Sequence, residues 1–346
     1  VHKTIIIYFI NDHSFYFFIK LEKDGFVVLE EFFWPEECED LQIAIKKIIK
    51  NSDTEHKCIF TTHEAKKQQL KDKYFLESND KMRLFYEEQA FDEDGNLKYD
   101  ETRSLNKIGH ALHLLNSVFR CYTYCSRVKT VCEELGFEEP AVAQSMYIFK
   151  NPHIGGEVEP HQDATYLYTT PKPPIGFWIA LEDATMQNGC LWVVRGSHKS
   201  GVHRRLVRNP DKEDEDGTPA LVYDRPQPVY PESSFTPIPV NKGTCILIHG
   251  NVVHKSAPNK SEKSRHAYTF HVIETKNNEY SDANWLQEGE NAPFCNIYTT
   301  RQMVFTEESD DNDTDDLDDI DDNDDIIDID DNDEIDDIDD IDERDE

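Results

Sequence analysis

Five short runs of aromatic and β-branched residues follow Pro140, and they constrain the possible folds more than any other feature of the chain. They are residues 143–149 (AQSMYIF), 177–181 (FWIAL), 191–194 (LWVV), 244–248 (TCILI) and 266–273 (HAYTFHVI). Runs of this length, punctuated by Gly, Pro and Asn, predict β-strands. Short strands joined by long loops favour a double antiparallel sheet. We therefore expect a jelly roll, a cupin-like double-stranded β-helix, over residues 140–300.

The residues before Pro140 are predicted to be helical over 30–137. Pro35 suits the first turn of a helix, and apolar residues follow it at helical spacing up to Ile49. A second stripe runs through Ile108, Leu112, Leu115, Val118 and Phe119, so 106–137 is predicted to be helix, with a second helix over 122–135. Helices packed on a jelly roll make an α+β fold, and we expect residues 21–306 to form one domain.

The two ends of the chain differ from this domain. Residues 4–19 (TIIIYFINDHSFYFFI) are apolar, but polar residues interrupt them and no small-residue cleavage site follows, so they do not predict a signal peptide. We expect residues 1–20 to be either a buried strand or a segment foreign to the native protein. Residues 307–346 hold 26 acids and one Arg, and we expect them to be a disordered acidic tail. The spacing of an EF-hand loop is absent, so a solvated tail is favoured over a calcium site.

Charge and cysteine content exclude several classes of protein. The tail carries −25 of the formal charge of −34, which leaves −9 on the rest of the chain. The mildly acidic remainder of the chain lacks the clustered basic residues that bind nucleic-acid phosphates, so we expect no nucleic-acid partner. The apolar N-terminal run is too short for a membrane span. Eight scattered cysteines without a C-x-x-C pair, in a chain without a clear signal peptide, predict free thiols and a cytoplasmic location. We also expect a monomer.

One group of residues suggests a metal centre. His161 and Asp163 form an H-x-D pattern, and alternation along a strand would point both side chains to the same side. His254 follows another predicted strand and a Gly-Asn turn, so it can lie beside them across a sheet. Two imidazoles and one carboxylate on a single face are the ligand set of non-haem iron(II) oxygenases. H-x-D alone is common, and a single His is more often a surface or hydrogen-bonded core residue.

Arg265 strengthens the metal hypothesis. It opens an aromatic run, where a lone cation is costly to bury without an anionic partner. Arginine is suited to bidentate capture of a carboxylate. A dicarboxylate such as 2-oxoglutarate, chelating iron(II) at one end and meeting Arg265 at the other, accounts for both features. The expected cofactors are therefore Fe(II), 2-oxoglutarate as co-substrate, and O2.

Several blocks of the chain resemble the phytanoyl-CoA dioxygenase family. They are SLNKIGHALH (104–113), PHQDATYLYT (160–169), GFWIALEDATMQNGCLWVVRGSHKSG (176–201), LIHGNVVHKS (247–256), SRHAYTFHVIE (264–274) and NWLQ (284–287). The resemblance covers about residues 23–299 and leaves out both ends. It implies iron ligands at His161, Asp163 and His254.

The same resemblance implies contacts to 2-oxoglutarate. They fall on His161 and Asp163 at the metal and on Lys107, Met146, Trp178, Ser256 and Arg265. Without the resemblance, Lys107 would pass for a charge on a helix surface, and Met146 and Trp178 for core residues. Retention of Asp163 argues against a halogenase.

The implied reaction is oxidative decarboxylation of 2-oxoglutarate to succinate and CO2, coupled to hydroxylation of a small molecule of fatty-acyl or acyl-CoA type. Residues 166–174 and 196–235 are expected to wall the pocket, with Tyr168 and Phe235 as candidate contacts. His249, His266 and His271 are interpreted as supporting or packing residues. His198 and His203 lie in a basic loop that either meets an anionic substrate or is solvated. Two alternatives remain: a zinc hydrolase, and a non-catalytic jelly-roll binding protein that acts through its acidic tail.

Overall fold

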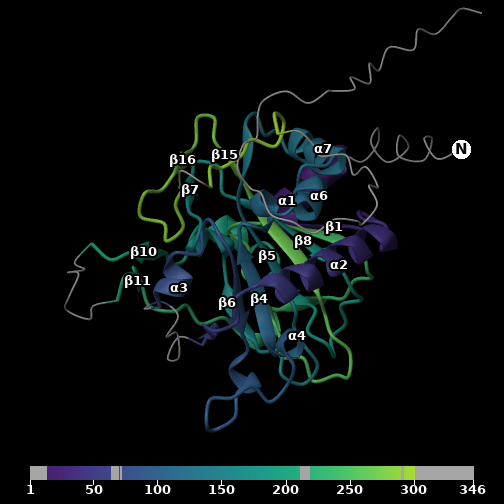
Figure 1. Cartoon of the computed structure of the whole chain (residues 1–346). Helices are drawn as coiled ribbons and strands as arrows, with labels where there is room; N and C mark the ends of the chain where they lie inside the picture. The colour runs from purple at the N-terminus through teal and green to yellow at the C-terminus, as the bar shows by residue number, and fades with distance from the viewer. Residues whose placement is uncertain (1–13, 64–69, 71, 211–218, 290–291, 301–346) are drawn as a thin grey trace, which may run out of the picture. The chain divides into compact units, whose positions relative to one another are not determined.

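The computed structural model describes residues 14–63, 70, 72–210, 219–289 and 292–300 (Figure 1). The predictions for residues 1–13 and for the acidic tail 307–346 therefore lie outside the described residues.

The largest element is an eight-stranded sheet in the order β1-β13-β8-β15-β5-β4-β3-β2. Its strands are β1 (Phe26–Leu29), β2 (Cys58–Ile59), β3 (Met82–Tyr86), β4 (Leu105–His110), β5 (Pro140–Ile148), β8 (Ile175–Ala180), β13 (Cys245–His249) and β15 (Ala267–Glu274). Neighbouring strands are antiparallel except β2 and β3, which are parallel. Strands far apart in the chain are paired in this way, as a jelly roll requires.

A second, four-stranded sheet has the order β12-β9-β14-β6. Its strands are β6 (Val158–His161), β9 (Leu191–Val193), β12 (Thr236–Ile238) and β14 (His254–Ser256). Two small pairs complete the strands, namely β10 (Leu206–Arg208) with β11 (Leu221–Tyr223), and β16 (Glu279–Tyr280) with β7 (Thr169–Thr170). Two packed antiparallel sheets with added helices confirm the predicted α+β jelly roll.

The helices gather mainly before the jelly-roll strands. The α-helices are α1 (Ser14–Asp24), α2 (Pro35–Asn51), α3 (Lys73–Leu76), α4 (Glu101–Ser104), α5 (Leu112–Leu115), α6 (Ser117–Thr123) and α7 (Ser126–Glu134). The 3-10 turns are η4 (Glu88–Ala90), η5 (Asp163–Thr165), η6 (Ser197–Ser200) and η7 (Glu232–Ser234). Helix α2 begins at Pro35 and buries one face, from Cys38 to Ile49, as its sequence spacing predicts.

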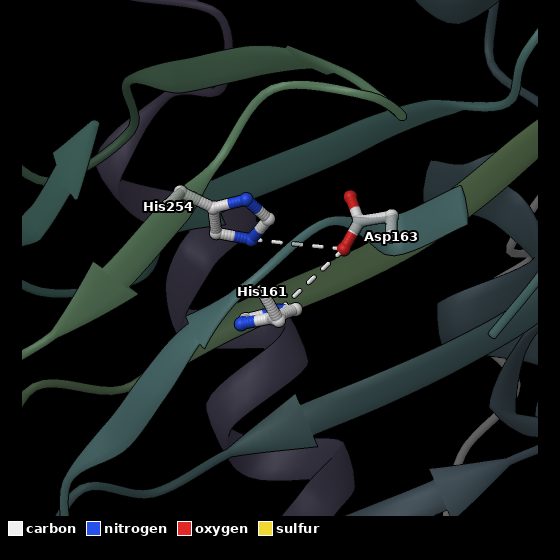
Figure 2. Close-up of side chains that lie close together, drawn as sticks. All are labelled: His161, Asp163 and His254. Carbon is white, nitrogen blue, oxygen red and sulfur yellow. Dashed lines mark ion pairs between the residues drawn. The ribbon is translucent and has the colours of Figure 1, made fainter. Parts of the chain in front are cut away.

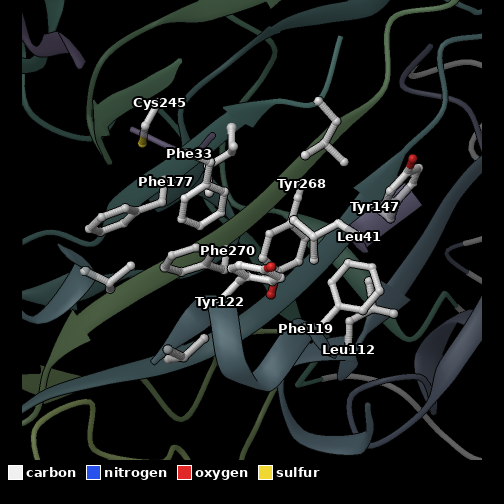
Figure 3. Packing of buried hydrophobic residues seen from close by; sticks show 14 of the residues in the cluster. Phe33, Leu41, Leu112, Phe119, Tyr122, Tyr147, Phe177, Cys245, Tyr268 and Phe270 are labelled. Atoms are coloured by element: carbon white, nitrogen blue, oxygen red, sulfur yellow. The ribbon is translucent and has the colours of Figure 1, made fainter. Parts of the chain in front are cut away.

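Alternation along the central strands explains how both faces of the large sheet are used. On β8, Phe177 and Ile179 belong to the core shared with α2, α6 and α7, whereas Trp178 and Ala180 pack toward the second sheet. Figure 3 shows the helix-side core, where Phe177 stacks on Phe270 with 4.7 Å between ring centroids. Helices α2, α6 and α7 therefore cover one face of the large sheet, and the second sheet faces the other.

The predicted helix over 106–137 is wrong in its first part. Residues Leu105–His110 form strand β4, which pairs with β3 and β5 inside the large sheet. Both faces of this strand are largely buried. Polar and apolar residues therefore do not alternate along it as they do along a strand with one exposed face. Farther on, helix is present, but as the three short pieces α5, α6 and α7. The region 30–137 also contributes β2 and β3, so it is not purely helical.

The described part of the N-terminal apolar run is also helical. Residues from Ser14 onward form α1, and Phe18 and Ile19 on this helix are 46% and 45% exposed. The prediction of a buried strand is thus wrong for these residues. All eight cysteines lie in the described part of the chain and are unpaired, which confirms the predicted free thiols.

Candidate functional site

A cavity of about 300 Å³ opens between the two sheets, on the face of the large sheet opposite α2, α6 and α7. All eight predicted site residues line it or stand at its wall: Lys107, Met146, His161, Asp163, Trp178, His254, Ser256 and Arg265. They come from β4, β5, β6, η5, β8, β14 and the segment before β15. Residues up to 158 positions apart, such as Lys107 and Arg265, therefore meet in one space.

The second sheet brings the two histidines together. His161 is the last residue of β6 and pairs directly with His254, the first residue of β14. Their ring centroids are 4.2 Å apart. The prediction that His254 lies beside the H-x-D pair across a sheet agrees with this register.

Asp163 also lies beside the two histidines, but strand alternation does not bring it there as predicted. Strand β6 ends at His161, and Asp163 opens the 3-10 turn η5, so strand alternation does not place it. Gln162, between them, is 1% exposed, and its Nε2 donates to the Asn251 carbonyl at 2.6 Å. A Cβ at Gly176 would lie only 3.0 Å from Asp163 Oδ2. The glycine therefore gives the carboxylate the room that it occupies.

The three side chains present ligand atoms to a single point (Figure 2). Asp163 Oδ1 lies 3.7 Å from His161 Nε2 and 3.6 Å from His254 Nε2. One ligand atom from each residue lies within 4.8 Å of the other two. Atoms that bind one ion at about 2 Å stand about 3–4 Å apart, so this triad can hold a metal ion.

The histidine tautomers suit metal binding. His161 Nδ1 lies 2.9 Å from the Glu159 carbonyl, and His254 Nδ1 lies 3.2 Å from the Val252 carbonyl. A carbonyl accepts only, so each Nδ1 must carry its hydrogen and each Nε2 keeps its lone pair for a metal. Burial alone would raise the pKa of Asp163, but His254, His271 and His161 outweigh it and hold the pKa below its usual range. The carboxyl is thus ready as an anionic ligand.

His271 supports the third ligand. Its Nε2 lies 3.3 Å from Asp163 Oδ2, the oxygen that does not face the two histidine ligands. Gln144 Nε2 lies 3.3 Å from His271 Nδ1, which leaves Nε2–H to donate to the carboxylate. The interpretation of His271 as a supporting residue agrees with this geometry.

We expect His271→Phe to lower iron(II) affinity about 10–100-fold, because Asp163 would lose the donor that orients it. Anaerobic iron(II) titration measures the effect. The matched control is His266→Phe, since His266 bonds Tyr147 and does not line the cavity. A folded His271→Phe protein with parental iron affinity would contradict the supporting role.

The cavity lining also includes Arg265, which is buried and forms no ion pair with an acidic side chain of the described residues. It is 1% exposed, and burial lowers its pKa to about 10. Its Nε donates to the Gly189 carbonyl at 3.1 Å, and Nη1 has no partner among the described residues. The guanidinium stands 5.2 Å from the Trp178 ring. Arg265 precedes β15 by two residues, so it does not open that strand as predicted, but it keeps a free donor for a carboxylate.

Lys107 and Met146 lie together on neighbouring strands. Lys107 Nζ is 3.6 Å from Met146 Sδ and 3.6 Å from the centroid of the Phe60 ring. The lysine is 7% exposed, and burial lowers its pKa to about 7. Lys107 is thus a buried cavity residue on β4 and not the helix-surface charge that the sequence alone would suggest.

Other candidates are not placed in the cavity. Tyr168 is stacked by Arg205 at 4.2 Å, and Phe235 is covered by Lys255 at 4.4 Å; neither lines the cavity, whereas Tyr166 and Leu167 do. His198, His203 and His249 also lie outside its lining. Conversely, the cavity exposes Glu87, Asn106 and Lys150, for which the sequence analysis found no role. A charged residue directly after an apolar strand, as at Lys150, was the only available signal.

Comparison with known proteins decides the family. A family model described as phytanoyl-CoA dioxygenase (PhyH) matches residues 21–267. Phytanoyl-CoA dioxygenase domain-containing protein 1 of Bos taurus is 46% identical over 285 residues, which cover 81% of this chain and 97% of the bovine protein. The chain belongs to the phytanoyl-CoA dioxygenase family. The Caenorhabditis elegans homolog is 46% identical over 284 residues, covering 81% and 97%, and a phytanoyl-CoA dioxygenase of Arabidopsis thaliana is 42% identical over 263, covering 76% and 89%.

Solved structures agree with this family in fold. EctD from S. alaskensis in its apoform superimposes with a TM-score of 0.53 at 17% identity, covering 85% of this chain and 89% of EctD. The epimerase SnoN, in complex with Fe3+, alpha ketoglutarate and nogalamycin RO, gives 0.51 at 13% identity, covering 81% and 97%. The family match supports a dioxygenase-type enzyme, and the solved structures agree with it in fold. In the described part of this PhyH-family chain, no helix is long and apolar enough to cross a membrane.

Proposed function

We propose that this protein is an iron(II)- and 2-oxoglutarate-dependent dioxygenase that hydroxylates a small molecule. The observation that carries the proposal is the pairing, in one cavity, of the His161–Asp163–His254 triad with the Arg265 guanidinium. The triad offers a metal site, and Nη1 of Arg265 is buried with no hydrogen-bond partner in the part of the chain that the structure describes. A buried cation with a spare donor is costly unless an anion joins it, and a dicarboxylate bound at the metal supplies that anion.

The residues fit both groups. His161, Asp163 and His254 would hold iron, with positions left open on the cavity side. Arg265 and Ser256 would hold the distal carboxylate, and Lys107, Met146 and Trp178 would complete the pocket. Iron(II) with 2-oxoglutarate supplies the oxidation, in which O2 gives one oxygen atom to succinate and the other to a C–H bond of the substrate.

The protein's own part is to bind, orient and keep out water. The two Nδ1–H···carbonyl contacts fix the imidazole rings, and His271 fixes the carboxylate. Asp163 and His254 are 7% and 6% exposed, and Arg265 is 1% exposed, so both the carboxylate and the guanidinium are shielded from bulk water. In such surroundings electrostatic interactions are stronger than in water.

The substrate is proposed to be a small molecule of fatty-acyl or acyl-CoA type. Apolar side chains line part of the cavity, namely Phe60, Phe75, Leu167, Leu206 and Trp285, and they pack in one cluster. Aromatic and aliphatic walls suit a hydrocarbon portion of a substrate. The name of the Arabidopsis relative, phytanoyl-CoA dioxygenase, agrees with such a substrate. A cytoplasmic location, a monomeric state and the absence of a nucleic-acid partner stay predictions.

The proposal can be tested without a substrate. Purified protein held without oxygen should develop a weak visible charge-transfer band only when iron(II) and 2-oxoglutarate are both present. His161→Ala should lose the band because one of three ligands is gone. The matched control is His153→Ala, an exposed histidine that pairs with Glu262 and should leave the band unchanged.

Iron binding without the band, in folded parental protein, would contradict the proposed function and favour the non-catalytic alternative. Tight binding of zinc in place of iron, with no effect of 2-oxoglutarate, would favour a hydrolase.

A further inference from the structure

Lys150 is an unusual residue beside the proposed co-substrate site. It lies two residues after β5, is 2% exposed and lines the cavity. Its φ is +37°, and it is the buried one of four described non-glycine residues with positive φ. Strained backbone at a buried lysine persists only where the surroundings hold it, and such strain concentrates at functional sites.

The ammonium group is held by backbone carbonyls and not by an acid. Lys150 Nζ donates to the Gly156 carbonyl at 2.6 Å and to the Ala257 carbonyl at 2.9 Å. No carboxylate forms an ion pair with it within the described residues. Burial, and then the charge of Arg265, lower its pKa to about 7. The buried amine thus satisfies two carbonyls close to Arg265, at a cost in desolvation.

Lys150 also contacts both backbone anchors of Arg265. Its carbonyl accepts from the Arg265 backbone N at 3.2 Å. The Gly189 carbonyl, which accepts from Arg265 Nε, belongs to a glycine that packs against the lysine stem: a Cβ on Gly189 would lie 2.8 Å from Lys150 Cδ. The backbone and the side-chain stem of Lys150 thus both lie against the groups that hold Arg265.

The same amine reaches the chain that carries the other proposed carboxylate contact. Ala257, whose carbonyl it holds, directly follows Ser256 at the end of β14, the strand that begins with His254. Gly156, its second carbonyl partner, is fixed at its N–H by Glu87 Oε1 at 3.0 Å. One lysine thus joins the segments after β5, before β9 and after β14.

We propose that Lys150 is a positioning residue for the dicarboxylate end of the site, acting by holding Arg265 and the Ser256–Ala257 segment in place for 2-oxoglutarate. This inference rests on the proposed function. A positioning role differs from a purely structural one in what the loss of Lys150 does. Loss of Lys150 should weaken 2-oxoglutarate binding but leave iron binding unchanged, because the triad binds the iron.

The test compares Lys150→Met, Lys150→Arg and the parent by the anaerobic charge-transfer band, titrated with 2-oxoglutarate at saturating iron(II). Iron affinity is measured separately, without 2-oxoglutarate. We expect Lys150→Met to raise the 2-oxoglutarate Kd about 10–100-fold, as loss of an outer partner of a bound group does, with iron affinity unchanged. Lys150→Arg keeps the charge and should bind better than Lys150→Met. The matched control is Lys172→Met, since Lys172 also holds a backbone carbonyl, that of Gly136, but lies outside the cavity lining.

Parental 2-oxoglutarate affinity in folded Lys150→Met would overturn the inference, and so would an equal loss of iron affinity, which would mean general distortion. If Lys150→Met does not fold, Lys150→Gln, whose shorter side chain cannot hold both carbonyls, takes its place: weaker 2-oxoglutarate binding with intact iron affinity supports the inference, and parental 2-oxoglutarate affinity overturns it. A parent protein without the band would instead overturn the proposed function, and this inference with it.

Discussion

Asp163→Ala should abolish the conversion of 2-oxoglutarate to succinate while leaving the fold intact. The carboxylate is the one anionic member of the triad, and its Oδ1 stands 3.6–3.7 Å from both histidine Nε2 atoms. Without it, iron would keep only two neutral ligands. Because loss of an outer partner alone costs up to about 100-fold, loss of this ligand should lower succinate formation by more than that. The measurement is succinate released per protein under saturating iron(II), 2-oxoglutarate and O2.

Circular dichroism and the melting temperature establish that the Asp163→Ala protein is folded. Asp282→Ala serves as control, because Asp282 is exposed and lies outside the cavity lining. Succinate formation at the parental rate in folded Asp163→Ala would refute the assignment of Asp163 as a ligand.

Arg265→Met should remove 2-oxoglutarate binding and cost little stability. Loss of one partner from a buried charge pair costs about 2–5 kcal/mol, which is a thirtyfold or greater rise in the 2-oxoglutarate Kd. In the free protein, however, Arg265 makes one side-chain hydrogen bond and leaves Nη1 without a partner among the described residues. An apolar side chain of similar length removes that unsatisfied donor, which is worth about 1–3 kcal/mol.

The melting temperature of Arg265→Met should consequently stay within about 4 °C of the parental value, or rise, since about 1 kcal/mol moves it by about 2–4 °C. Loss of affinity without loss of stability is what separates a binding arginine from a structural one. Arg103→Met, at an exposed arginine that stacks on Tyr99, controls for the substitution itself. A large fall in stability with parental 2-oxoglutarate affinity would show that Arg265 holds the fold and not a ligand.

The strands of the jelly roll could be predicted because their pattern is local. Each of the five runs after Pro140 corresponds to a strand, and the helix-side and cavity-side residues of β8 alternate as strand geometry requires. The start of α2 at Pro35 could be predicted from an equally local signal, a proline in the first turn of a helix. Strand β4 was not predictable in this way, because it is buried on both faces and its apolar residues also fit a helical stripe.

For the site, the sequence by itself determined which residues are candidates: the H-x-D pattern, His254, Arg265 and, through family resemblance, Lys107, Met146, Trp178 and Ser256. Tertiary structure decided how they meet. Asp163 faces the histidines because a 3-10 turn and Gly176 allow it, and Tyr168 and Phe235 were wrongly expected in the cavity.

Only the tertiary structure showed that Arg265 Nη1 has no partner among the described residues, and that Lys150 contacts the backbone on which Arg265 rests. Sequence patterns report spacing along the chain and hence which face of an element a residue occupies. Burial, hydrogen-bond satisfaction and the approach of a glycine to a distant side chain depend on segments tens to hundreds of residues apart. Those contacts exist only after the two sheets have packed, and for that physical reason no local pattern encodes them.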